Sequence, residues 1–152
     1  MIEIIPFTEE KKEYIKLLNY EWLQKYFTVE PHDVVQLSDP QKEIIDKGGL
    51  IFYALYNNEI VGTYSLIKVK EKEYELAKMA VTEKCKGLGI GKIMMEHSIN
   101  EAKKINSPIL SLFSNTKLEA AIHLYRKYGF IEMPLPKDVH YERANIKMEK
   151  II

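Results

Sequence analysis

The sequence predicts an α+β fold built around one mixed β-sheet. Three observations support this class: two helical patterns precede a run of three strand patterns, a strand, helix, strand unit follows, and a short helix with two strands comes last. With 152 residues, 46% apolar and 29% charged, the chain has the size and composition of one globular domain. We therefore expect a single domain over residues 1–152.

The first third of the chain predicts one strand and two helices. A strand over 2–7 is followed by a helix over about 9–27, with Thr8 as its N-terminal cap. The segment 30–33 predicts a break. A second helix is expected to start at Asp39-Pro40 and end at Gly48-Gly49, because proline suits the first helical position and glycine suits the residue after the last.

A β-hairpin and a buried strand are predicted next. Strand patterns over 50–56 and 60–67 flank Asn57-Asn58, a pair that tolerates the backbone of a tight turn. The segment 73–81 then has the length and apolar content of a largely buried strand. These three strands are expected to lie side by side.

An amphipathic helix over about 90–105 follows this strand. Its apolar face consists of Ile90, Met94, Met95, Ile99, Ala102 and Ile105. Ser107-Pro108 ends the helix, and 109–113 predicts a strand beside 73–81. A strand, helix, strand crossover of this kind places a ligand at the carboxyl end of its first strand.

The last part of the chain predicts a helix and two strands. Asn115 or Thr116 is expected to cap the helix, and Gly129 to end it in a left-handed conformation before a strand at Phe130. Alternating apolar residues predict a final strand over 141–148.

Composition excludes several classes of protein. No apolar run reaches the roughly 20 residues of a membrane span, and the N-terminus lacks the features of a signal peptide, so we expect a cytoplasmic protein. A lone Cys85 cannot form an internal disulfide, and the four histidines have no metal-ligand spacing, so no metal is expected.

The charges are balanced overall but unevenly distributed. The net charge is zero, which argues against nucleic acid as a main partner. Residues 1–50 contain ten acids and six bases, whereas residues 51–152 contain twelve acids and sixteen bases. A basic second part suits a phosphorylated ligand, and an acidic first part suits a cationic amine.

The segment from Lys84 to Lys92, KCKGLGIGK, predicts a phosphate-binding loop between the buried strand and the amphipathic helix. Glycines allow close approach of the backbone, and the free N–H groups at the start of a helix face an anion. A P-loop is excluded because Ile93 follows Lys92 where Ser or Thr is needed. The glycines also lack the G-x-G-x-x-G spacing of a dinucleotide-binding fold.

Two motifs instead resemble those of the GNAT N-acetyltransferase superfamily. Residues 86–91 are similar to its coenzyme A pyrophosphate loop, with Lys86 where the family usually has Gln or Arg. Asn115, Ala120-Ala121, Leu124-Tyr125 and Tyr128-Gly129-Phe130 are similar to its second signature, in the same order. The resemblance implies the GNAT fold, with six to seven strands and about four helices, along essentially the whole chain.

The resemblance also implies a cofactor site for acetyl-coenzyme A. The strand carrying Lys78, Met79, Ala80 and Val81 is expected to part from its neighbour and pair with the pantetheine arm, so that an N–H near Met79 or Ala80 polarises the thioester. The expected pyrophosphate loop consists of Lys86, Gly87, Leu88, Gly89, Ile90, Gly91 and Lys92. Asn115 matches a residue that contacts the cofactor arm.

Two residues are candidates for acid–base catalysis. Tyr125 matches the family tyrosine proposed to protonate the coenzyme A sulfur. Glu75 lies eleven residues before Lys86, the offset of the base in the histone acetyltransferase branch, and the alternative base is a water chain. Weaker candidates for lining the acceptor site are Glu21, Tyr26, Glu30 and His32. A covalent role for Cys85 is disfavoured because it belongs to the cofactor loop.

The leading interpretation is direct transfer of an acetyl group from acetyl-coenzyme A to a primary amine of a small molecule or peptide. Two alternatives stay open: an acyl-coenzyme A-binding sensor or partner module without turnover, and transfer of a longer acyl group. Neither nucleic acid nor a membrane is expected as a partner. The identity of the amine and assembly as a homodimer are left open.

Overall fold

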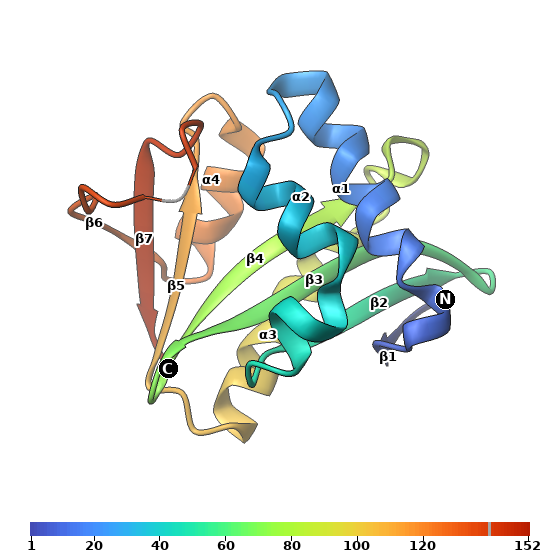
Figure 1. Cartoon of the computed structure of the whole chain (residues 1–152), viewed down its shortest axis with the longest axis horizontal. Helices are drawn as coiled ribbons and strands as arrows, with labels where there is room; N and C mark the ends of the chain where they lie inside the picture. Colours follow the sequence, from blue (N-terminus) through green and yellow to red (C-terminus); the bar gives the residue numbers. More distant parts are fainter. Residues whose placement is uncertain (140) are drawn as a thin grey trace.

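A computed structural model describes residues 1–139 and 141–152, which form a seven-stranded mixed sheet with four α-helices (Figure 1). The strands are β1 (Ile2–Pro6), β2 (Leu50–Tyr56), β3 (Glu59–Lys70), β4 (Glu73–Val81), β5 (Ile109–Ser114), β6 (Ile131–Met133) and β7 (Ile146–Ile151). The helices are α1 (Glu13–Tyr26), α2 (Pro31–Ser38), α3 (Ile90–Lys104) and α4 (Glu119–Lys127). The predicted fold class and element order are confirmed.

The strands lie in the order β1-β2-β3-β4-β5-β7-β6. All neighbours are antiparallel except β4 and β5, which α3 connects as a parallel pair. The predicted hairpin is confirmed: Asn57 and Asn58 have φ angles of 52° and 65°, the left-handed pair that a two-residue turn requires.

The helices cover both faces of the sheet (Figure 1). On one face, Ile15 and Leu23 of α1 and Leu37 of α2 pack on Tyr53 of β2. On the other, the predicted apolar face of α3 packs on β3 and β4, and α4 adds Ile122, Leu124 and Tyr125. Burial of both faces explains why β3 carries six consecutive buried residues, at positions 61–66.

The central strand β4 has two irregularities that matter for function. It pairs with β5 only through Glu73, Tyr74 and Glu75, after which the two strands separate, as Figure 1 shows. It also contains a β-bulge, because Ser65 of β3 pairs with Ala77 and Thr63 pairs with Ala80, so that one β3 residue faces two β4 residues. Lys78, within the bulge, has a φ angle of 54°.

Three predictions for the first helices are wrong. Residues 9–11 form a separate 3₁₀ turn before α1, and the Thr8 side chain makes no capping hydrogen bond. The segment predicted as a break begins α2, because Glu30 and Asp33 form a capping box around Pro31 at the first turn. The helix predicted from Asp39-Pro40 is a single π turn over Gln41–Ile45.

Two boundaries near the C-terminus also differ. The last helix begins at Glu119 rather than beside Asn115 or Thr116, because the Asn115 Oδ1 accepts the Lys117 N–H at 2.9 Å in a local turn. The final strand begins at Ile146 rather than at Tyr141. Gly129 has the predicted left-handed backbone, with a φ angle of 92°. Within the described residues, every helix falls short of what crossing a bilayer requires.

A buried ionic network explains why Tyr141 lies outside the strand. The Lys78 Nζ donates to the Asp33 Oδ1 at 3.0 Å and to the Tyr141 hydroxyl at 2.9 Å. Arg143 binds both oxygens of Asp33, at 2.7 and 2.8 Å. The Tyr141 hydroxyl in turn donates to Gln36. These contacts join α2, the β4 bulge and the segment 141–143, which are far apart in the sequence.

Asp33 is ionised in this network. Burial alone would raise the pKa of its carboxyl, but the hydrogen bond from Arg143 and the charge of Lys78 prevail and lower the pKa to about 2. Because this folded-state pKa lies below the unfolded value of 3.8, the carboxylate stabilises the fold at neutral pH. That contribution is lost as the pH falls toward 2.

We expect Asp33→Asn to lower the free energy of unfolding at neutral pH by ~3–5 kcal/mol, because the buried Lys78 and Arg143 lose their shared counter-charge. The variant should also lose less stability than wild type between about pH 4 and pH 2. Urea unfolding measures both effects, with the exposed Asp138→Asn as control. Wild-type stability in the Asp33 variant would show that the network is not needed for folding.

Candidate functional site

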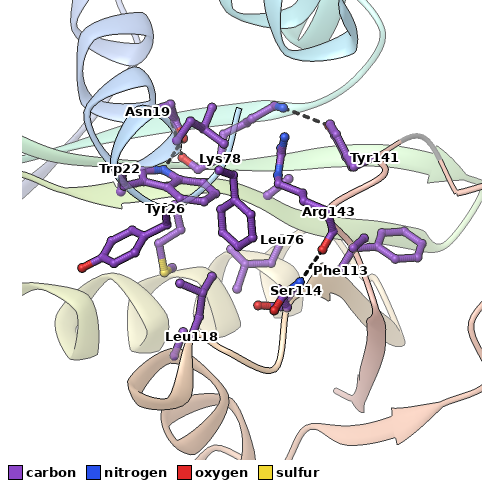
Figure 2. A pocket seen from close by; sticks show the side chains of 18 of the residues that line it. Asn19, Trp22, Tyr26, Leu76, Lys78, Phe113, Ser114, Leu118, Tyr141 and Arg143 are labelled. Atoms are coloured by element: carbon purple, nitrogen blue, oxygen red, sulfur yellow. Dashed lines mark hydrogen bonds between the residues drawn. The ribbon is translucent and has the colours of Figure 1, made fainter. Parts of the chain in front are cut away.

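A cavity of about 260 Å³ opens where β4 and β5 separate. Its walls come from α1, α2, β4, β5, α4, the loop before α3 and the segment 141–144 (Figure 2). It contains the following candidates from the sequence: Glu75, Lys78, Met79, Ala80, Val81, Lys86, Gly91, Asn115 and Tyr125. Elements distant in the sequence therefore bring most of the candidate residues to one place.

The free edge of β4 forms one wall of this cavity. From Leu76 to Val81 the strand has no partner on its β5 side, so its backbone groups on that side are open to an extended ligand. The Lys78 carbonyl accepts a hydrogen bond from the Asn19 Nδ2 at 3.4 Å. Asn19 also accepts the Trp22 indole N–H at 3.2 Å, so α1 is tied to the bulge (Figure 2).

The glycine loop fits a phosphate group. Gly89 precedes α3 with a φ angle of 80°, and a Cβ atom added at Gly87, Gly89 or Gly91 would meet nothing within 4 Å. The space in front of the loop is therefore open, and the first N–H groups of α3 have no acceptor within the helix. Lys84, Lys86 and Lys92 are all exposed around it. Lys86 lies 3.5 Å from Glu83 and over the ring of Tyr26.

Not every loop residue lines the cavity. The Ile90 side chain is buried in the core, so only its backbone is available to a ligand. Leu88 is exposed, with 48% of its surface accessible. Cys85 is a buried free cysteine outside the cavity walls. Among the described residues, no group of three His, Cys, Asp or Glu side chains could hold a metal ion.

Glu75 is the last β4 residue paired with β5, and its side chain borders the cavity. Burial raises the pKa of its carboxyl to about 7, although the charges of Lys78 and Lys147 act in the opposite direction. Lys78, although close in the strand, does not pair with Glu75, because it binds Asp33 and Tyr141. A carboxylate with this pKa can accept a proton near neutral pH.

Tyr125 lines the opposite side of the cavity, on α4. It is half-buried, its ring lies 6.0 Å from that of Phe130, and burial raises the pKa of its hydroxyl to about 12. The hydroxyl is therefore protonated at neutral pH and can donate. Asn115 borders the same cavity, but its Nδ2 donates to the Arg143 carbonyl at 2.7 Å, which ties it to the neighbouring segment.

The weaker acceptor-site candidates have different surroundings. Tyr26 lines the cavity, whereas Glu21 accepts the Glu83 N–H at 2.8 Å. Glu30 pairs with Arg143 at 3.3 Å. The His32 ring meets the Tyr141 ring edge-on, with 5.2 Å between centroids.

Sequence reasoning missed the side chains of Asp33, Tyr141 and Arg143, and it assigned Lys78 a role only through its backbone. One signal for the network was present: Lys78 interrupts an otherwise apolar stretch, Leu76 to Val81. A lysine in a buried strand requires an acidic partner, but the sequence does not identify Asp33 as that partner.

Comparisons with known proteins agree with this geometry. The sequence model of the Acetyltransferase (GNAT) family matches residues 16–130. An uncharacterised N-acetyltransferase of Bacillus subtilis is 29% identical over 119 residues, which are 74% of this chain and 77% of that protein.

Solved structures share the fold. A GNAT-family acetyltransferase from Staphylococcus aureus matches with a TM-score of 0.89 and 24% identity, over 99% of both chains. The PaiA N-acetyltransferase of Thermoplasma acidophilum, solved in complex with coenzyme A, matches with a TM-score of 0.79 and 18% identity, over 100% of this chain and 99% of that one. The chain belongs to the GNAT family and is an acetyl-CoA-dependent N-acetyltransferase.

Proposed function

We propose that the protein transfers the acetyl group directly to a primary amine of a small molecule or peptide, without an acetylated enzyme intermediate. The observation that carries this proposal is that the free β4 edge, the glycine loop and Glu75 border one cavity. Acetyl-coenzyme A supplies an activated thioester. The remaining requirements are a neutral amine, a polarised carbonyl and a proton for the departing thiolate.

The backbone of Lys78, Met79, Ala80 and Val81 pairs with the pantetheine arm in this proposal. An N–H of Met79 or Ala80 then points at the thioester oxygen and polarises it. The unpaired β4 edge supports this role, because its backbone groups have no other strand partner on that side. Asn115 and Tyr125 lie across the cavity, beside the same arm.

The loop over 86–92 holds the pyrophosphate. Support comes from the open space in front of its glycines, the free N–H groups of the first α3 turn and the exposed lysines. Lys86 keeps a cation where the family usually has Gln or Arg. Its present contact with Glu83 is a surface pair, which exchanges readily for a phosphate.

Glu75 acts as the general base through water. A strand rises about 3.3 Å per residue, so Glu75 and Met79 lie farther apart than one hydrogen bond can span. Water must therefore relay the proton. Its pKa of about 7 matches the task, since about half of the carboxyl groups are ionised at pH 7 and the carboxylate is basic enough to accept a proton. Tyr125 returns a proton to the coenzyme A thiolate.

Glu75→Gln should lower kcat/KM most strongly near neutral pH, with recovery as rising pH increases the fraction of free amine. Wild-type kcat/KM should rise through pH 7 as Glu75 loses its proton. Release of free thiol from acetyl-coenzyme A, measured against a panel of amines, gives both profiles. The matched control is the exposed Glu71→Gln. A Glu75→Gln profile parallel to wild type would assign the base to bulk water.

Tyr125→Phe should lower kcat by ~10²–10⁴-fold, because a general acid is lost, while the ring still packs on Phe130. The thermal midpoint and cofactor affinity should stay close to wild type. Tyr128→Phe is a suitable control, since it removes a hydroxyl bound to Glu96 outside the cavity. Wild-type kcat in the Tyr125→Phe variant would show that the Tyr125 hydroxyl is not the general acid and that the residue only packs in the structure.

A further inference from the structure

The acceptor end of the cavity contains two cations that are already neutralised. We take as the acceptor end the group of lining residues that hydrogen bonds and charges connect, Asp33, Glu75, Lys78, Tyr141 and Arg143; Lys86 and Gly91, which also line the cavity, belong to the glycine loop. The side chains of Lys78 and Arg143 are only 4% and 13% exposed. Both bind Asp33, which is itself fully buried.

Arg143 also has further partners. Its guanidinium contacts Glu30 at 3.3 Å and stacks near the rings of Tyr141, at 4.4 Å, and Trp22, at 5.7 Å. Lys78 donates its second hydrogen bond to Tyr141 (Figure 2). The positive charges of Lys78 and Arg143 are therefore balanced by Asp33 and Glu30, so a carboxylate of an incoming ligand meets no net positive charge at this pair of cations.

Glu75 is different. No residue in the described part of the chain lies within hydrogen-bond or ion-pair distance of its carboxylate, although the side chain borders the cavity. The charge of Lys147 lowers the pKa of Glu75, but Lys147 is paired with Glu149 at 3.2 Å and does not line the cavity. Among the described residues, the acceptor end thus has one carboxylate without a direct ion-pair partner, and its two cations are paired with other carboxylates.

The lining of the cavity also has apolar parts. Trp22, which Asn19 holds in place, lines it from α1, and Phe113 lines it from β5, on another side in Figure 2. Leu76 and Ala144 also belong to the apolar lining. A ligand that fits here carries a cationic amino group toward Glu75 and an apolar arm toward the rings.

We propose that the acceptor is a small primary amine with an aromatic or aliphatic arm and no carboxylate beside the amino group. This inference rests on the proposed function. An α-amino acid brings a second anion next to Glu75, while the charges of both nearby cations are already balanced by Asp33 and Glu30, so the site disfavours amino acids. The corresponding amine without the carboxylate brings only a cationic amino group, which the Glu75 carboxylate attracts.

Three acceptors that each contain a phenyl ring distinguish the effect of charge from the effect of size: 2-phenylethylamine, phenylalaninamide and phenylalanine. We expect kcat/KM, corrected for the free-amine fraction at each pH, to be highest for the amine. The value for the amide should exceed that for the amino acid by at least tenfold, because the two differ mainly in the charge of one group. Thiol release from acetyl-coenzyme A is the readout.

Glu75→Gln provides the internal control. Loss of the base lowers kcat/KM for all three acceptors alike. The ratio of kcat/KM for the amide to kcat/KM for the amino acid therefore isolates the effect of charge. In the Glu75→Gln variant this ratio should fall toward one. A ratio of amide to amino acid near one in the wild-type enzyme would overturn the inference. Acetylation of other amines, but of none of these three, would overturn it as well. Neither result would contradict direct transfer. Failure to acetylate any amine in a broad panel would overturn the proposed function as well.

Discussion

The separation of β4 from β5 after Glu75 is the constraint on which the rest of the site depends. A sheet that stayed paired along this edge would leave no backbone groups for a ligand and no cavity between α1 and α4. The bulge at Lys78 keeps β4 paired with β3 while it diverges from β5. The loop and the start of α3 follow directly, so the same strand leads to the glycine loop at the cavity.

The buried pair of Asp33 and Lys78 supports this arrangement from the other side. A lysine with a φ angle of 54° is unfavourable by itself, and its side chain is held by two partners from α2 and the segment 141–143. Those contacts place α2 over the bulge and draw Tyr141 and Arg143 into the acceptor wall. The ion pairs that stabilise the fold therefore also line the cavity.

The sequence predicted the elements with clear periodicity, such as α3, and those with distinctive turn residues, such as Asn57-Asn58 and Gly129. It missed α2 because its cap uses Glu30 and Asp33 rather than Ser or Thr, and it placed a strand at Tyr141 because alternation does not reveal a long-range ionic contact. The cofactor-site candidates belong to the segment 78–92 and to the second motif, which contains Asn115 and Tyr125, so the sequence alone could propose them. The acceptor wall could not, because Asp33, Lys78 and Arg143 meet only in three dimensions.

Residue-resolved amide hydrogen exchange tests the role of the β4 edge most directly. At saturating acetyl-coenzyme A, amides within 76–81 and within the loop 87–92 should exchange more slowly, whereas those of β1 and β2 should not change. Adenosine 3′,5′-bisphosphate, which lacks the pantetheine arm, should protect the loop alone. Unchanged exchange within 76–81 at saturation, with binding verified by calorimetry, would contradict the account, because the free edge of β4 would then not be the surface that holds the arm.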